Sequence, residues 1–173
     1  MSPSSAPVPH SDQTVVIVAT FDHPREQVFD AWVRPELMAQ WFAPVGQTFH
    51  VEHMDVRPGG TFHWCIRSPS FSCWTMGTYL EVERPERLVY SWSIADASGT
   101  AATPASQGHD PEWPQESIVR VTFEERNGGD RRSQTVVTLE QNVSEALAKK
   151  TGAYPSWLQM LEALERMLAT ATA

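Results

Sequence analysis

The stretch that decides the fold is TFHWCIRSPSFSCWTMGTYLEVERPERLVYSWSI, at residues 61–94. Apolar and polar residues alternate in three segments of it, which is the period of a half-buried β-strand. The side chains expected on the inward face are Phe62, Trp64 and Ile66, then Trp74, Met76, Thr78, Leu80 and Val82, and finally Leu88, Tyr90, Trp92 and Ile94. The pattern predicts an antiparallel sheet with one apolar face and one wet face.

Further strand signals lie on both sides of this stretch. Segments 14–21, 47–56, 117–125 and 135–141 are rich in β-branched or alternating residues, and a hairpin turn is expected at 127–130. In segment 47–56 the apolar residues change phase, from Phe49 and Val51 to Met54 and Val56. A β-bulge near Glu52 explains that change. The sequence thus predicts one strand followed by a meander of six.

Four helices are expected around the sheet. Pro24 and Pro35 each suit a first helical turn, which predicts short helices over 24–33 and 35–42. Asn142 followed by Glu145 resembles a capping box and predicts a helix to Lys150. A last helix over 155–169 carries one apolar stripe, made of Trp157, Met160, Leu161, Leu164, Met167 and Leu168. That stripe is expected to pack on the apolar face of the sheet.

Length and composition limit the possible partners. We expect a disordered leader over residues 1–12 and a single domain over 13–170, with a long loop at 95–115 that Trp113 could anchor. The formal net charge of −8 argues against nucleic acid or an anionic membrane as partner, and no segment is apolar enough to span a bilayer. The doublet Lys149-Lys150 is interpreted as solvated surface. Without a secretory signal, Cys65 and Cys73 are expected as free thiols in the cytoplasm, a cross-strand disulfide being the alternative.

The element order resembles the helix-grip fold of the START/Bet v 1-like superfamily, an α+β fold in which a curved antiparallel sheet wraps around a long C-terminal helix. Over residues 14–170, short sequence motifs resemble the family of the C-terminal domain of the activator of Hsp90 ATPase. These motifs are FDHPREQVFDAW at 21–32, RPELMAQWF at 34–42, DVRPGG at 55–60, GTYLEVERPERLVYSW at 77–92 and VTFEE at 121–125. Where relatives often carry a His and a Gly-Trp pair at the start of the last helix, this chain has Ala153 and Ser156-Trp157.

The resemblance implies a pocket for an apolar or amphipathic small molecule between sheet and helix. The residues expected to line it are Trp41, Phe62, Trp64, Trp74, Met76, Tyr90, Trp92, Trp157, Met160, Leu161 and Leu164. The alternative is that these bulky side chains fill the space themselves. Some superfamily members are enzymes, such as cyclases or dehydratases, and an enzyme using the same pocket is the first rival function. A chaperone-interaction module is the second, although no feature of the sequence supports contact with Hsp90.

The residues alone give no convincing catalytic or metal site. His50 and His53 point to opposite faces of a regular strand, so they would chelate only across a bulge, with His63 on the next strand. His63 and Cys65 share the face expected to be outer. Glu52 and Asp55 are the best acid/base candidates if a bulge turns them inward. We therefore expect no metal, no cofactor and no catalytic residue; homodimerisation is possible because edge strands need protection.

Overall fold

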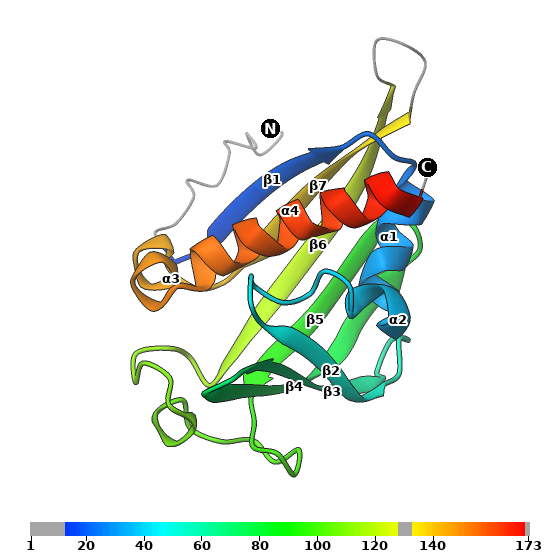
Figure 1. Cartoon of the computed structure of the whole chain (residues 1–173). Helices are drawn as coiled ribbons and strands as arrows, with labels where there is room; N and C mark the ends of the chain where they lie inside the picture. Colours follow the sequence, from blue (N-terminus) through cyan, green and yellow to red (C-terminus); the bar gives the residue numbers. More distant parts are fainter. Residues whose placement is uncertain (1–12, 128–132, 172–173) are drawn as a thin grey trace, which may run out of the picture.

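The structure is a computed structural model, and it describes residues 13–127 and 133–171. Seven strands form one antiparallel sheet in the order β1-β7-β6-β5-β4-β3-β2 (Figure 1). The strands are β1 (Val15–Phe21), β2 (Thr48–Met54), β3 (Thr61–Ser68), β4 (Phe71–Glu83), β5 (Arg87–Ile94), β6 (Glu116–Asn127) and β7 (Ser133–Gln141). The strand after the helices therefore starts a meander of six, as predicted, and the structure adds that β1 pairs with the last strand, β7. The expected turn at 127–130 and the leader at 1–12 lie largely or wholly outside the described residues.

The helices lie on the concave side of the sheet. Helix α4 (Ala153–Ala171) runs along that face, with α1 (Arg25–Val33) and α2 (Pro35–Met38) near one end of it and α3 (Glu145–Thr151) at the other (Figure 1). Trp157, Met160, Leu161 and Leu164 are all buried, so the apolar stripe of α4 faces the sheet as expected. None of the helices in the described ranges combines the length and apolar character needed to cross a membrane.

Three helix boundaries differ from the prediction. Helix α2 ends at Met38, and turns carry the chain on to the buried residues Trp41 and Phe42. The N-cap of α3 is Ser144, whose hydroxyl accepts a hydrogen bond from the backbone N–H of Leu147 at 3.1 Å. Asn142 instead accepts from the backbone N–H of Ile118, so the predicted capping box is wrong. Because Gly152 closes α3 with a φ of +87°, α4 can start directly at Ala153, before Pro155.

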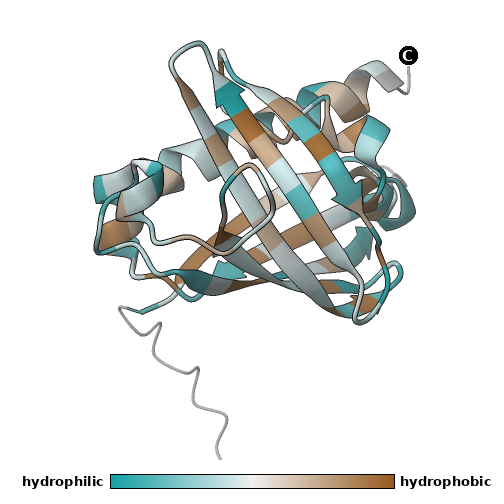
Figure 2. Ribbon diagram, turned by 90° about the horizontal axis from the view of Figure 1, so that it is seen from below, coloured by the Kyte–Doolittle hydropathy of each residue, from teal (hydrophilic) through white to brown (hydrophobic). Residues whose placement is uncertain are grey.

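Two bulges set which side chains face α4. The first lies between Val51 and His53 in β2, as the phase change predicted. The second lies between Tyr79 and Glu81 in β4, and the sequence analysis missed it. Figure 2 shows apolar and polar bands alternating along the strands. Because successive side chains point to opposite faces, the extra residue of each bulge moves the later residues of its strand to the other face.

The missed bulge makes part of the predicted inward face of β4 wrong. Trp74 pairs with Cys65 and Met76 pairs with His63, so both lie on the outer face of the sheet. Leu80, at the bulge, is exposed. The inward residues before the bulge are Cys73, Thr75, Gly77 and Tyr79, because they share a face with Ile66, Trp64 and Phe62. The first part of the 95–115 loop covers the outer face, where His63 Nε2 lies 3.1 Å from the carbonyl oxygen of Asp96.

The half of the concave face near α1 and α2 is filled by aromatic rings. Trp32 lies 4.7 Å from Trp41 between ring centroids, and Phe62 stacks on Trp64 at 3.8 Å. Phe42 contacts both Trp64 and Trp157, at 5.2 and 5.8 Å. Edge-to-face and offset contacts of this kind add to the free energy gained by burying the rings. This half is a packed core.

Gly77 permits this packing because it brings no side chain between the strands. A Cβ atom at Gly77 would overlap the carbonyl oxygen of Ser91 and lie 2.5 Å from the Phe62 ring. We predict that Gly77→Ala lowers the free energy of unfolding by about 3 kcal/mol, the upper part of the usual range for overpacking. Urea denaturation followed by tryptophan fluorescence measures the change.

The control is Gly46→Ala, at a position with a φ of +82° and no atom within 4 Å of the added Cβ. There the cost is backbone strain alone, about 1 kcal/mol. Equal losses for the two variants would contradict a steric role for Gly77.

Candidate functional site

The other half of the concave face holds a cavity of about 700 Å³. Its floor comes from the sheet, its roof from the first two turns of α4, and its mouth from the second part of the 95–115 loop together with the end of α3. The principal lining residues are Ile66, Cys73, Thr75, Trp92, Ile94 and Gln141 below, Ala153, Ser156, Trp157 and Met160 above, and His109, Asp110, Trp113 and Lys150 at the mouth.

Trp157 separates the cavity from the aromatic core. Its indole N–H donates to the side-chain carbonyl of Gln141 at 3.0 Å, and the amide nitrogen of Gln141 donates to the Ser117 hydroxyl at the same distance. The ring packs edge-to-face on Trp92 at 5.5 Å and against Trp32 at 6.2 Å. These contacts fix the indole as a wall with one side toward packed rings and the other toward open space.

Of the eleven residues predicted to line a pocket, Trp92, Trp157 and Met160 line this cavity. Trp41, Phe62, Trp64, Tyr90, Leu161 and Leu164 lie in the packed core. The indole N–H of Trp41, for example, donates to the carbonyl of Ala31 at 2.9 Å, deep between α1 and α2. Trp74 and Met76 lie on the outer face of the sheet. The alternative that bulky side chains fill the space is thus correct for one half of the sheet.

The loop at 95–115 supplies the mouth residues, which sequence reasoning did not single out as site residues. A short 3-10 helix (Ala105–Gln107) and the left-handed Gly108 turn the chain so that His109 reaches the cavity. The His109 ring packs edge-to-face on Phe71 at 5.5 Å. Trp113 was expected to anchor the loop, and its indole does line the cavity. The available signal was an aromatic residue in an otherwise small and polar segment.

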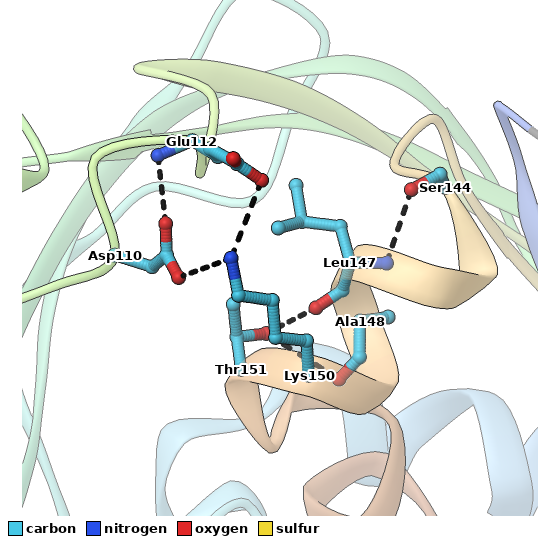
Figure 3. Close-up of polar contacts among 7 residues, drawn as sticks. All are labelled: Asp110, Glu112, Ser144, Leu147, Ala148, Lys150 and Thr151. Atoms are coloured by element: carbon cyan, nitrogen blue, oxygen red, sulfur yellow. Dashed lines mark hydrogen bonds and ion pairs between the residues drawn. The ribbon is translucent and has the colours of Figure 1, made fainter.

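A charged cluster ties the loop to α3 across the mouth (Figure 3). Lys150 Nζ lies 3.3 Å from Asp110 Oδ2 and 3.5 Å from Glu112 Oε2. The backbone N–H of Glu112 donates to Asp110 and, with Lys150, keeps the pKa of that carboxyl low. The hydrogen bond between Lys150 and Asp110 in turn raises the pKa of Lys150. Lys150 is therefore exposed, as expected, and also has defined partners.

Cys73 and His109 form the one thiol–imidazole contact of the cavity wall in the described residues. The Sγ atom lies 3.7 Å from Nε2 of His109. Burial, with a smaller effect from Cys65, raises the pKa of Cys73 to about 12, and burial lowers the pKa of His109. Both groups are therefore neutral near pH 7, the opposite of an activated thiolate–imidazolium pair. Cys65 and Cys73 are free thiols, and they lie on opposite faces of the sheet.

Of the remaining candidates from the sequence, the bulge in β2 brings His53 opposite His63, with ring centroids 6.4 Å apart. His50 and His53 are bound to the threonine hydroxyls of Thr48 and Thr61, each at 3.0 Å. Asp55 forms an ion pair with Arg57 at the surface, at 2.7 Å. Over residues 13–127 and 133–171, no group of three or more His, Cys, Asp or Glu side chains has the arrangement of a metal site.

Solved structures with the same arrangement come from several bacteria. A Staphylococcus epidermidis protein is 26% identical, with 92% of this chain and 91% of that chain covered and a TM-score of 0.72. A Mycobacterium smegmatis protein is 20% identical, with 91% of each chain covered and a TM-score of 0.74. A Chromobacterium violaceum protein is 22% identical over 90% of this chain and 96% of that chain, with a TM-score of 0.68.

These likenesses confirm the helix-grip fold expected from the sequence. A comparison with curated proteins found no significant match. The family model described as activator of Hsp90 ATPase homolog 1-like protein matches residues 22–169, which run from just before α1 into the last turn of α4. The chain therefore belongs to the activator of Hsp90 ATPase homolog 1-like family.

Proposed function

We propose that this protein binds one small, uncharged, largely apolar molecule in the cavity between the sheet, α4 and the 95–115 loop. The observation that carries the proposal is the cavity itself: about 700 Å³ beside three indoles, those of Trp92, Trp113 and Trp157. Ligand pockets typically have volumes of about 300–1,000 Å³ and mostly apolar walls with a few polar groups. The helix-grip fold of the family supports ligand binding at the same coarse level.

The charges around the cavity favour a neutral ligand. Lys150 is the only cation among the lining residues, and it is already paired with Asp110 and Glu112. Asp110 is likewise occupied, and His109 is neutral because burial lowers its pKa. An ionised ligand would lose its hydration on entering the cavity and would find no unpaired opposite charge there, which is costly in a partly buried site. Binding of an anion is further opposed by the formal net charge of −8.

A few polar side chains are available to orient the ligand. Gln47, Thr75 and Ser156 line the cavity, and within the described residues their side chains have no hydrogen-bond partner. A hydroxyl or carbonyl group on the ligand could bond to them without competing with an existing contact. The ligand class that fits best is therefore an aromatic or alicyclic molecule with one or two neutral polar groups.

The rival function, an enzyme with the same cavity, would need an activated polar pair. Cys73 and His109 form the one thiol–imidazole contact that the described part of the chain offers there, and burial keeps the thiol protonated. A nucleophilic cysteine requires a lowered pKa. The pair is better suited to donate one weak S–H hydrogen bond than to attack a substrate.

Ligand charge should control affinity. N-phenyl-1-naphthylamine is uncharged, and 8-anilinonaphthalene-1-sulfonate has the same ring skeleton with one sulfonate added. We expect the neutral probe to bind at least about tenfold more tightly, a difference of about 1.4 kcal/mol. Probe fluorescence measures both affinities. Equal affinities, or tighter binding of the sulfonate, would contradict the neutral-ligand proposal.

Filling the cavity should remove binding without disturbing the core. Ser156 lies on the roof, so Ser156→Trp places an indole in the open space, and we expect the affinity for the neutral probe to fall at least about tenfold. Thr170→Trp adds the same ring at the exposed far end of α4 and serves as the control. If both variants bind the probe like the parent protein, the cavity is not the binding site.

The pH dependence of alkylation tests the state of Cys73. Only the thiolate reacts with iodoacetamide, and a thiol with a pKa of about 12 is roughly one part in ten thousand thiolate at pH 8. We expect the rate at Cys73, followed by peptide mass spectrometry, to rise about tenfold per pH unit from pH 7 to 10. A plateau below pH 8 would reveal an activated thiolate and favour the enzyme.

The ion pairs at the mouth should slow ligand exchange. Lys150→Met removes both contacts to the loop while keeping an apolar stem, and we expect the neutral probe to dissociate about two- to fivefold faster. Salt screens exposed ion pairs, so added sodium chloride should speed exchange in the parent protein and have little effect in the variant. Lys149→Met, on the adjacent residue, is the matched control. Equal dissociation rates in all three proteins would show that the loop does not gate the cavity.

A further inference from the structure

The two edges of the sheet differ in how they are protected. β2 carries a bulge between Val51 and His53 and includes His50, Glu52 and His53, which disfavour pairing with another strand. β1, VVIVATF, has no charge and no proline, and its seven residues pair with β7 in an unbroken register. Natural edge strands usually carry such blocking features. Among the described residues, nothing pairs with the outer edge of β1, which is therefore available to a further strand.

A groove runs along the concave side of this edge. It has a volume of about 190 Å³ and is lined by Ile17 to Phe21 of β1 and by Leu158, Leu161, Glu162 and Glu165 of α4. Leu158 at its rim is 39% exposed, and Val18, whose side chain lies on the outer face of β1, is 61% exposed. In the part of the chain that the structure describes, the hydrogen bonds of β1 run to β7 alone. An added strand would find both free backbone groups and a recess for alternate side chains.

The groove carries negative charge without a counter-charge. Glu162 and Glu165 lie three residues apart on one face of α4, both are exposed, and neither has an ion-pair partner among residues 13–127 and 133–171. A side chain that points from an added strand into the groove meets these carboxylates. Lysine or arginine at that position is attracted, whereas aspartate or glutamate is repelled.

We propose that the β1 edge and this groove bind an extended segment of a partner protein in which basic and apolar residues alternate. The segment adds to the sheet beside β1, its backbone pairs with β1, and its basic side chains reach Glu162 and Glu165. A second copy of this chain fits less well, because two-fold pairing through β1 brings the same unpaired glutamates from both copies to one face. The surface is separate from the cavity, so this proposal does not depend on the ligand.

The test uses an end-blocked, fluorescein-labelled nine-residue peptide in which lysine alternates with valine. We expect fluorescence anisotropy to show saturable binding that weakens as sodium chloride is added. A peptide with glutamate in place of every lysine should bind at least about tenfold more weakly. Amide hydrogen exchange should show added protection within residues 15–21.

Paired variants separate this groove from the general acidity of the protein. Glu162→Gln with Glu165→Gln should weaken the lysine peptide at least about tenfold, whereas Glu124→Gln with Glu125→Gln, the same charge change on exposed residues of β6, should not. Val18→Lys should also weaken binding, since it places a charge on the open edge without altering the core.

Three results would overturn the proposal. One is equal binding of the lysine peptide to both double-glutamine variants. Another is protection from hydrogen exchange that appears only at amides outside β1 and its neighbouring strands. The third is a concentration-dependent dimer of the parent protein, seen by light scattering, that the Val18→Lys substitution dissociates, together with no binding of the peptide to the parent protein. In that case a second copy of the chain occupies the edge.

Discussion

The position of Trp157 divides the space between the sheet and α4 into a solid half and a hollow half. Its ring closes the aromatic core by contact with Trp32 and Phe42, and its N–H is held by Gln141. A buried indole N–H needs a partner, so the bond to Gln141 fixes which way the ring faces. On the far side lies the cavity, which Trp92 and Trp157 both line. Both the stability of the fold and the location of its open space depend on this one side chain.

The hollow half persists because two different elements support its walls. α4 is held over the sheet by its core contacts, so its first turns can project over the cavity without filling it. The mouth is defined by a loop whose second part is tethered to Phe71 through His109 and to Lys150 through Asp110 and Glu112. These exposed ion pairs are individually weak and hold the loop without fixing it permanently. A mouth that opens readily, above walls that do not collapse, suits a site that exchanges a small molecule.

The alternating pattern of apolar residues predicted the strands and the fold. The location of the cavity depends on features outside that pattern, namely the bulge in β4 and the residues of the 95–115 loop. In β2 the phase change from Phe49 and Val51 to Met54 revealed the bulge. In β4 both phases carry bulky residues, so hydrophobicity alone could not choose between Trp74 and Tyr79 as the inward residue. Gly77 was the missed signal, since a glycine inside a strand often marks a close approach of another group. His109, Asp110 and Lys150 meet only through tertiary structure, and no spacing along the chain could place them together.

The two sheet edges differ at the surface as clearly as the two halves of the sheet differ inside. An uncharged, unbroken strand such as β1 is a liability in water, because it invites pairing with any exposed strand. A chain can remove that liability with a single lysine or a bulge, as β2 does with its irregular register. Next to β1 the chain instead presents Glu162 and Glu165, which repel acidic segments and admit basic ones. Acidic side chains in that position restrict which strands can approach rather than closing the edge, and a restriction of that kind is a property of recognition surfaces.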